Sequence, residues 1–257
     1  MPHLVCIVPV CPMRATASHR SEQVSQLLFG DVAEIIGLEG NFVQVKYLFD
    51  DYEGWCQRSQ LAEINASQFK GSPEVLSAGR TNEVELNSKR MHLPLGCSLG
   101  HIKNNKATWE IYNVQYKGNL IAPGEHLNDT KLLKEIAMQF LNTAYLWGGR
   151  SVYGIDCSGF CQTIFRFIGI PLLRDAYQQA SQGEAIGFLQ EANLGDLAFF
   201  DNEEGRITHV GMLLDQETII HASGRVRIDT IDHQGIVNVE TGLHTHKLRI
   251  IKRMLPG

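Results

Sequence analysis

The sequence predicts small β-barrels followed by an α+β domain, and three observations carry this prediction. Short apolar runs separated by turn residues fill residues 1–65, two stretches of helical periodicity follow residue 129, and four strand-like runs lie between residues 195 and 254. Several short strands at close spacing are typical of a small barrel. Helices followed by a run of strands indicate an α+β domain with an antiparallel sheet.

The barrel prediction covers two segments. Residues 1–65 contain the strand-like runs "CIVPV", "DVAEIIGLEGNFVQVKYLF" and "EGWCQRSQL". Residues 66–127 repeat this style less regularly, in "RMHLPLGCSLG", "ATWEIYNVQYKG" and "NLIAPGEHL". We therefore expect one barrel over 1–65, a second over 66–127, and the α+β domain over 128–257.

Two helices are expected in the last domain. The first follows Asp129 as N-cap and has one apolar face, made of Leu132, Leu133, Ile136, Ala137, Phe140 and Leu141. The second begins at Cys157 and ends at Gly169, with Pro171 just beyond. Its apolar face consists of Phe160, Cys161, Ile164, Phe165 and Ile168. The strand-like runs are "GDLAFFD", "RITHVGMLLD", "ETIIHASG" and "HKLRIIKRM", with Asp215 and Gln216 in a turn between two of them.

Composition excludes several classes of protein. The 257 residues carry a net charge of -5 and no Lys/Arg-rich block, which argues against nucleic-acid binding. The six cysteines lack Cys-x-x-Cys spacing and are too few for a disulfide framework, so we expect no metal, no cofactor and a reducing compartment. The apolar run near the N-terminus is short and broken by Pro9 and Pro12. It predicts neither a signal peptide nor a membrane span, so we expect a cytoplasmic protein.

The position of Cys157 at the start of a predicted helix suggests a nucleophile. A helix N-terminus carries a partial positive charge of roughly +0.5 and exposed N–H groups. A thiol placed there favours its anion, which lowers the pKa from about 8.5 to roughly 3.5–7.5. The same N–H groups suit a developing oxyanion. A buried cysteine at this position is also a common structural feature, and Cys161, on the apolar face, is expected to be core.

Two histidines downstream complete a possible catalytic set. His209 lies in "RITHVGMLL" and His221 in "TIIHASG", in strands expected to be antiparallel neighbours. Paired strands bring such side chains into contact, so His221 would orient the ring of His209, which would act as general base. Other histidines, including His244 and His246, show that the chain also uses this residue elsewhere.

The motifs resemble the NlpC-type papain-like cysteine peptidases of bacterial cell-wall metabolism. The resemblance rests on "AYLWGGRSVYGIDCSGFCQTIFR", "LLRDAYQQA", "LGDLAFF", "ITHVGMLL" and "IIHASG", in this order. The segments "VPVCPMRATASHRSEQVSQLLFGD" and "DYEGWCQRSQL" are similar to a bacterial SH3-like barrel fused to such domains. The second barrel is inferred mainly from this family architecture.

The resemblance implies site residues and a substrate. Cys157 would be the nucleophile, His209 the base, His221 the orienting residue and Tyr145 a neighbour of the thiolate. The substrate class would be peptidoglycan stem peptides with a free N-terminal L-alanine, cut between γ-D-glutamate and a diamino acid. The residues implied to bind the substrate are Asp175, Asp156, Ser158, Arg174, Tyr52 and Glu22. The motif "LLRD" departs from the family's "LPRD" but keeps the charged pair.

Three functions therefore stand as alternatives. The first is a cytoplasmic endopeptidase that recycles released murein peptides. A second is an exported hydrolase or amidase that acts on intact peptidoglycan. A third is a non-catalytic module in which SH3-like barrels bind the wall. No nucleic acid or membrane partner is expected in any of them.

Overall fold

The computed structural model describes residues 3–255. The chain divides into two compact units. The first consists of Met1–Glu125 and Trp147–Tyr153, and the second of His126–Leu146 and Gly154–Gly257. Each is described by itself below. Among the described residues, no helix has the length and apolar character needed to cross a membrane.

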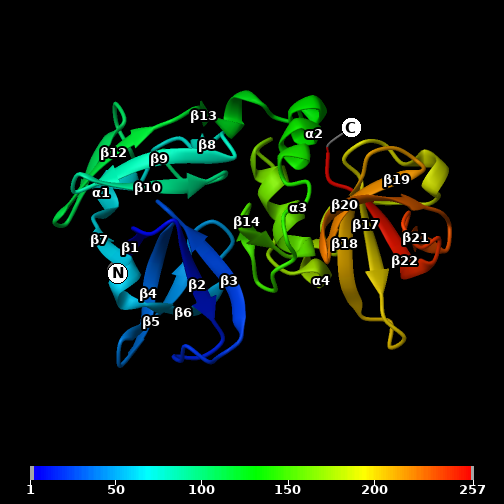
Figure 1. The fold of residues 1–257 in the computed structure, drawn as a ribbon, viewed down its shortest axis with the longest axis horizontal. Coiled ribbons are helices and arrows are strands. Elements are labelled where there is room, and N and C mark those ends of the chain that lie inside the picture. Colours follow the sequence, from blue (N-terminus) through cyan, green and yellow to red (C-terminus); the bar gives the residue numbers. More distant parts are fainter. Residues whose placement is uncertain (1–2, 256–257) are drawn as a thin grey trace. The chain divides into compact units, whose positions relative to one another are not determined.

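The first unit begins with a small antiparallel barrel-like sheet, in the strand order β3-β2-β6-β5-β4-β1-β7 (Figure 1). The strands are β1 (His3–Cys6), β2 (Val10–Arg14), β3 (Gln23–Leu28), β4 (Val32–Glu39), β5 (Phe42–Tyr47), β6 (Glu53–Gln57) and β7 (Leu61–Ile64). Alternation along β2 and β5 points Cys11, Met13, Val43 and Val45 inward. The tight β4–β5 turn holds Gly40 at φ +55°, a conformation that glycine adopts at little cost.

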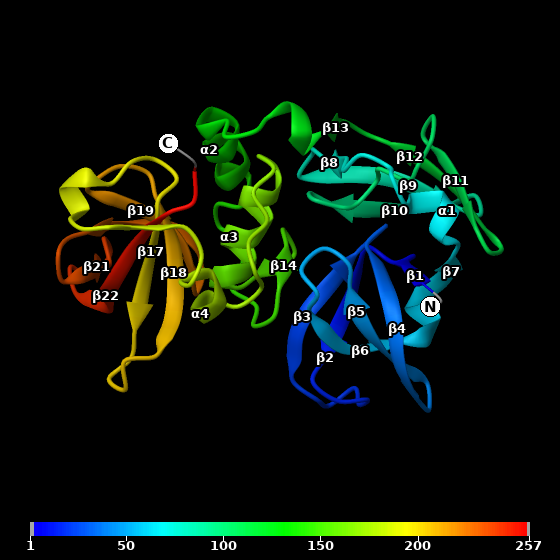
Figure 2. The ribbon, with the colours of Figure 1, turned by 180° about the vertical axis from the view of Figure 1, so that it is seen from behind.

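A second set of strands completes the first unit. β9 (Thr81–Leu86), β10 (Lys89–Pro94), β11 (Lys106–Trp109) and β12 (Tyr112–Lys117) form an antiparallel sheet in the order β10-β9-β12-β11 (Figure 2). β8 (Leu76–Ser77) pairs with β13 (Leu120–Ile121), and α1 (Ala66–Phe69) precedes both. Trp109 and Phe29 lie in one core, their ring centroids 5.3 Å apart. The two sets of strands thus share a hydrophobic core, while the boundary at residues 65/66 stays a prediction.

The segment Trp147–Tyr153, which includes β14 (Arg150–Ser151), also belongs to the first unit. Arg150 is buried and holds this segment. Its backbone N–H donates to Oε1 of Gln26 at 2.8 Å, and its Nη1 donates to the Gln26 carbonyl at 2.7 Å. The guanidinium also lies 3.4 Å from Oδ2 of the buried Asp31 and over the ring of Tyr47. A buried cation requires such partners, because removing it from water costs several kcal/mol.

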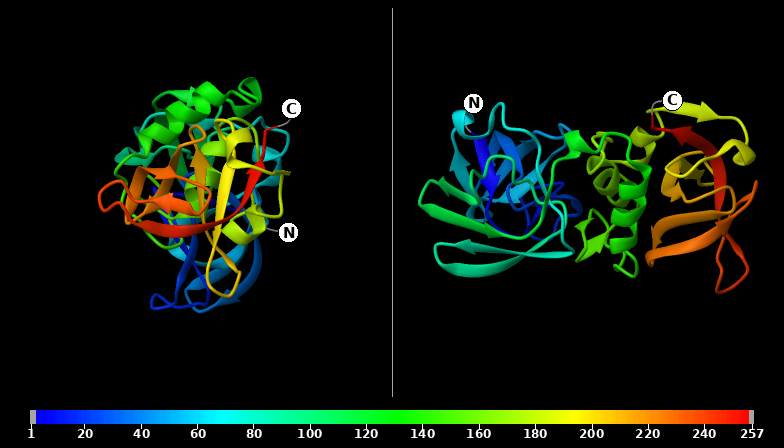
Figure 3. Two further views of the ribbon diagram at one scale, coloured as in Figure 1. Left: turned by 90° about the vertical axis from the view of Figure 1, so that its right-hand side faces the viewer. Right: turned by 90° about the horizontal axis from the view of Figure 1, so that it is seen from above.

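The second unit places helices against a sheet. α2 (Thr130–Gln139) begins at Asp129, whose side chain accepts a hydrogen bond from the N–H of Leu132. α3 (Cys157–Arg166) packs against α2, β18 and β19, and α4 (Ala176–Gln179) packs against β18 (Figure 3). Both long helices start where the sequence predicts. The described residues contain four α-helices in all, so the protein is richer in strands than a balanced α+β fold.

The sheet of the second unit closes on itself. Its order is β16-β22-β17-β18-β19-β20-β21, and β21 also pairs with β22. The strands are β16 (Glu184–Ile186), β17 (Leu197–Asp201), β18 (Ile207–Leu213), β19 (Thr218–Ser223), β20 (Arg225–Ile231), β21 (Gly235–Val237) and β22 (His244–Arg253), with β15 (Gly154–Ile155) preceding α3. The four predicted strands are confirmed as β17, β18, β19 and β22. The sequence interpretation omitted β20 and β21, which complete the ring.

Candidate active site

Cys157 is the first residue of α3 and is nearly fully buried. Asp156 caps the helix, since its Oδ1 accepts a 2.6 Å hydrogen bond from the N–H of Gly159. The thiol lies against the backbone of Val210 in β18, and hydrogen bonds from Val210 and Ser158 favour its anion. The Cys157 sulfur therefore lies beside Val210, the residue that follows His209 in β18.

The environment of the thiol opposes ionisation in the free protein. Burial raises the pKa of Cys157 to about 12, and the negative charge of Asp156 adds to this effect. The backbone hydrogen bonds and the Arg174 guanidinium act in the opposite direction but are outweighed. The expectation of a lowered thiol pKa is wrong here, because loss of solvation exceeds the stabilisation available from one helix terminus.

The two predicted histidines are in contact. Gly211 of β18 pairs with His221 of β19, which sets the register of the two strands. Nε2 of His209 lies 2.8 Å from Nδ1 of His221, and both side chains are buried. Strand alternation places both rings on the sheet face that carries Leu213 and Ile219. The predicted contact is confirmed.

Burial lowers the pKa of His209 well below its ordinary value, and the neighbouring rings of His221 and His246 act in the same direction. At neutral pH the imidazole is therefore neutral, as is the thiol. A neutral imidazole has a free ring nitrogen that can accept a proton. In the free protein, Cys157 is therefore a neutral thiol and His209 a neutral imidazole. A thiolate forms only when the thiol proton is transferred to a base.

Tyr145 lies next to this site. Its backbone N–H donates to the carbonyl of Gly224 at 2.9 Å, and the N–H of Ile155 donates to the carbonyl of Ala144 at 3.1 Å. These bonds hold Tyr145 between the end of β19 and the residues that lead into α3. Burial raises the pKa of Tyr145, and the nearby Cys157 and Asp156 act in the same direction, so its hydroxyl keeps its proton and remains a hydrogen-bond donor.

Three of the predicted binding residues form one buried cluster. Arg174 donates from Nη2 to Oδ2 of Asp156 at 2.6 Å and from Nη1 to Oδ1 at 3.1 Å. Its Nη1 also donates to Oγ of Ser158 at 3.0 Å. This bidentate arrangement holds the start of α3. The cluster fixes the start of the helix that carries Cys157, and a contact of these residues with a substrate stays a prediction.

Asp175 follows this cluster and differs from it in exposure. It is half-buried and precedes the short helix α4, where its N–H donates to Oε1 of Gln178 at 3.0 Å. Its carboxylate is thus placed near the surface beside Arg174. A half-buried carboxylate suits an ammonium group, and this role for Asp175 stays a prediction.

Two further predicted residues lie in the first unit. Glu22 is exposed, and its Oε1 accepts a 2.7 Å hydrogen bond from Nε1 of Trp147. The Trp147 carbonyl in turn accepts from Nε2 of Gln23 at 3.0 Å. Tyr52 is partly buried against the barrel core. The structure therefore links Glu22 to the "LWGG" motif, a contact that sequence reasoning did not foresee.

Sequence reasoning missed Asp229 and His246. Oδ2 of Asp229 lies 2.9 Å from Nε2 of His221. The ring of His246, on β22, stacks on that of His209 with 4.1 Å between centroids. The alternation of "RVRIDTI" could have predicted β20 and thus placed Asp229. His246 had no such signal, because its contact depends on β22 closing the sheet.

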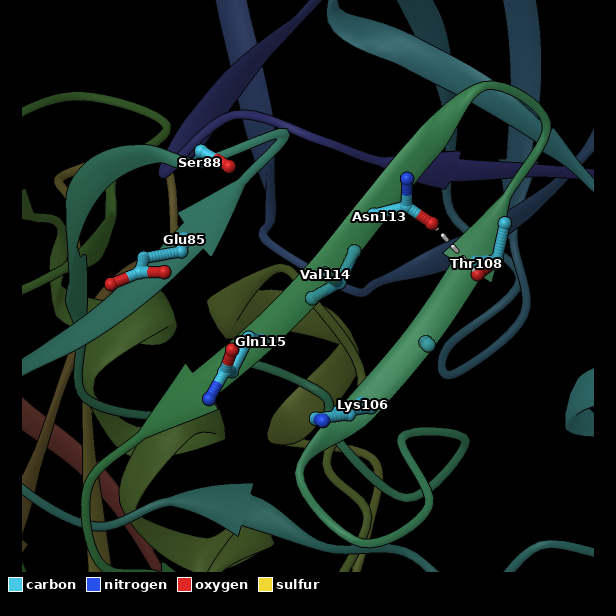
Figure 4. Close-up of a pocket in the computed structure, with 8 residues that line it drawn as sticks. Glu85, Ser88, Lys106, Thr108, Asn113, Val114 and Gln115 are labelled. Carbon is cyan, nitrogen blue, oxygen red and sulfur yellow. Dashed lines mark hydrogen bonds between the residues drawn. The ribbon is translucent and has the colours of Figure 1, made fainter.

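A separate hollow lies on the four-stranded sheet of the first unit. It has a volume of about 430 Å³ and is lined by Glu85, Ser88, Lys106, Ala107, Thr108, Asn113, Val114 and Gln115 (Figure 4). Its lining contains neither a thiol nor an imidazole. It therefore lacks the groups for the chemistry that the second unit presents.

Comparisons with known proteins bear on both units. Residues 142–243 match the NlpC/P60 family, and residues 13–61 match the bacterial dipeptidyl-peptidase Sh3 domain. A probable endopeptidase of Haemophilus influenzae is 34% identical over 116 residues, which are 44% of this chain and 70% of that protein. The chain belongs to the NlpC/P60 family. The matched NlpC/P60 residues include Tyr145, Cys157, His209, His221 and Asp229.

Two further NlpC/P60 relatives extend over more of the chain. The γ-D-glutamyl-L-lysine dipeptidyl-peptidase of Bacillus subtilis is 27% identical over 214 residues, covering 77% of this chain and 71% of that protein. An NlpC/P60 family protein of Bacillus cereus has a similar structure, with a TM-score of 0.83, 20% identity, and coverage of 99% of this chain and 100% of that one. At this identity the structural likeness concerns the fold.

Proposed function

We propose that this protein is a cysteine peptidase that hydrolyses the bond between γ-D-glutamate and a diamino acid in peptides derived from peptidoglycan. The observation that carries the proposal is the site of the second unit. Cys157 begins a helix and lies against Val210, next to a histidine that is hydrogen-bonded to a second histidine. This is the arrangement of nucleophile, base and orienting group that acyl transfer requires.

The first step forms an acyl-enzyme. His209 takes the proton of the Cys157 thiol as the sulfur attacks the γ-carbonyl carbon of the D-glutamyl residue. The negative charge that develops on the carbonyl oxygen is stabilised by N–H groups of the first turn of α3, with the Tyr145 hydroxyl as a further donor. The carbon–nitrogen bond then breaks, and the imidazolium gives its proton to the amine of the leaving diamino acid.

The second step restores the enzyme. His209 removes a proton from a water molecule, whose oxygen attacks the thioester carbon. The carbon–sulfur bond breaks, the acyl group leaves as a free carboxylic acid, and the sulfur regains its proton from the imidazolium. Proton transfer by a positioned imidazole typically contributes 10²–10⁴-fold to the rate.

For the substrate we propose a short stem peptide whose L-alanine amine is free. Asp175, in the same unit as Cys157, offers a carboxylate that is partly exposed, and its charge would attract an ammonium group. The B. subtilis relative is named for a γ-D-glutamyl-L-lysine bond, which supports the choice of bond.

We further propose that the protein recycles released peptides in the cytoplasm and that residues 66–127 form a second SH3-like barrel.

A peptide assay tests this function. We expect the protein to release L-Ala-D-Glu from L-Ala-γ-D-Glu-L-Lys or from the diaminopimelate analogue, as measured by mass spectrometry of the products. Acetylation of the alanine amine is expected to lower kcat/KM at least 100-fold, since it removes the charge that a carboxylate would bind. Equal turnover of both peptides would overturn the free-amine requirement. Cleavage of intact peptidoglycan instead would favour the exported hydrolase.

The pH dependence of kcat/KM is expected to follow the pKa values of two groups that are neutral at pH 7, the His209 imidazole and the Cys157 thiol. The pKa of His209 lies well below 6.5, so protonation of the base removes activity only as pH falls below that value. The thiol pKa of about 12 places the alkaline limb well above neutral pH. A profile from pH 4 to pH 10 should therefore be flat between about pH 7 and pH 9. An acid limb centred at or above pH 6.5 would contradict this environment for His209.

A further inference from the structure

The hydrogen-bonded series that begins at His209 continues past His221. Nε2 of His209 contacts Nδ1 of His221, and Nε2 of His221 contacts Oδ2 of Asp229 at 2.9 Å. His221 pairs with Arg227 across β19 and β20, so Asp229, two residues further on, is its diagonal neighbour on the same face. The side chains of His221 and Asp229 are each 1% exposed.

Asp229 is an ionised acceptor. Its Oδ1 accepts from Nη2 of Arg227 at 2.9 Å and from the N–H of Val239 at 3.0 Å. Burial raises the pKa of Asp229, but the hydrogen bonds from His221, Val239 and Arg227 outweigh burial and lower the pKa to about 2. A carboxylate can only accept, so Nε2 of His221 must carry a hydrogen.

Two arginines and two carboxylates surround this end of the hydrogen-bonded series. Arg227 also contacts Glu240 at 3.2 Å, and Glu240 contacts Arg225 at 2.7 Å. Two arginines and two carboxylates thus balance one another. The hydrogen on Nε2 of His221 is the one that its contact with Asp229 requires. With one hydrogen on Nε2, neutral His221 has a bare Nδ1.

The bare Nδ1 of His221 determines the tautomer of His209. It can only accept, so Nε2 of His209 must donate, and Nδ1 of His209 is left free of hydrogen. Resting on the function proposed above, we propose that Asp229 is a positioning residue that sets both imidazole tautomers, so that Nδ1 of His209 receives the thiol proton. Asp229 acts through two rings and touches neither the substrate nor the sulfur.

Replacement of Asp229 by asparagine tests this role. The amide has nearly the same shape but can donate from Nδ2 to Nε2 of His221, which would reverse both tautomers and place a hydrogen on Nδ1 of His209. We expect kcat to fall about 10²–10⁴-fold with KM changed less than threefold, the scale on which a wrong imidazole tautomer acts in other triads. The matched control is Asp232→Asn, whose partly exposed carboxylate also contacts a histidine, His244. That variant should keep kcat within twofold.

A measurement on the unaltered protein keeps the proposal testable if Asp229→Asn does not fold. We expect ¹⁵N NMR of the histidine side chains at pH 7.5 to show one hydrogen on Nε2 of His209 and one on Nε2 of His221. A hydrogen on Nδ1 of His209, or a doubly protonated His221, would overturn the proposal, as would an Asp229→Asn variant of normal kcat. If these tautomers are observed in a protein that cleaves no peptide, the proposed function fails and the tautomer assignment stands.

Discussion

Cys157→Ala is expected to lower kcat/KM for the stem peptide by at least about 10⁴-fold. The variant removes the atom that forms the acyl-enzyme, and loss of a nucleophile leaves only the contribution of binding and oxyanion stabilisation. The side chain is buried within a formed helix, so the fold should survive the loss of one sulfur. Steady-state kinetics with the free-amine peptide measure the effect, and circular dichroism confirms the fold.

The matched control is Cys161→Ala, one helical turn further along α3. Cys161 is fully buried, and burial raises the pKa of its thiol well above the ordinary value, so it stays protonated. Its truncation should leave kcat/KM within about threefold. Equal loss of activity in the two variants would mean that packing around α3, and not sulfur chemistry at Cys157, accounts for the first result.

Arg174→Met is expected to destabilise the second unit by about 3–5 kcal/mol. The substitution leaves the Asp156 carboxylate buried without its cation, and breaking a buried pair from one side carries a penalty of this size. The Arg174 and Asp156 side chains are 1% and 9% exposed. Hydrogen exchange of the α3 backbone amides, measured at pH 7, reports the stability of the helix that Asp156 caps.

Two variants show whether the charge is responsible. Arg206→Met removes an arginine of which 79% is exposed, paired with an exposed glutamate, and should change stability by less than about 0.5 kcal/mol. Adding Asp156→Asn to Arg174→Met removes the stranded charge and should restore part of the loss. A single Arg174→Met loss below about 1 kcal/mol would show that the pair contributes little.

Much of the second unit could be predicted from local pattern. The apolar spacing after Asp129 and Cys157 marks two helices because side chains one turn apart share a face, and both helices begin where predicted. Alternation located the strands of His209 and His221, whose contact follows from antiparallel pairing. The less regular strands of residues 66–127 gave no sign that Trp109 packs on Phe29 in a shared core.

The order of motifs along the chain is enough to predict the family and to propose Cys157 and His209 as nucleophile and base, because these predictions depend on residue type and spacing. Only the folded chain decided three further features. These are the protonation of the Cys157 thiol, the ion pair of Asp156 with Arg174, and the contacts of Asp229 and His246. They depend on burial and on which distant strands become neighbours. Loss of solvation and the closing of β22 onto β21 are long-range effects that no local pattern records.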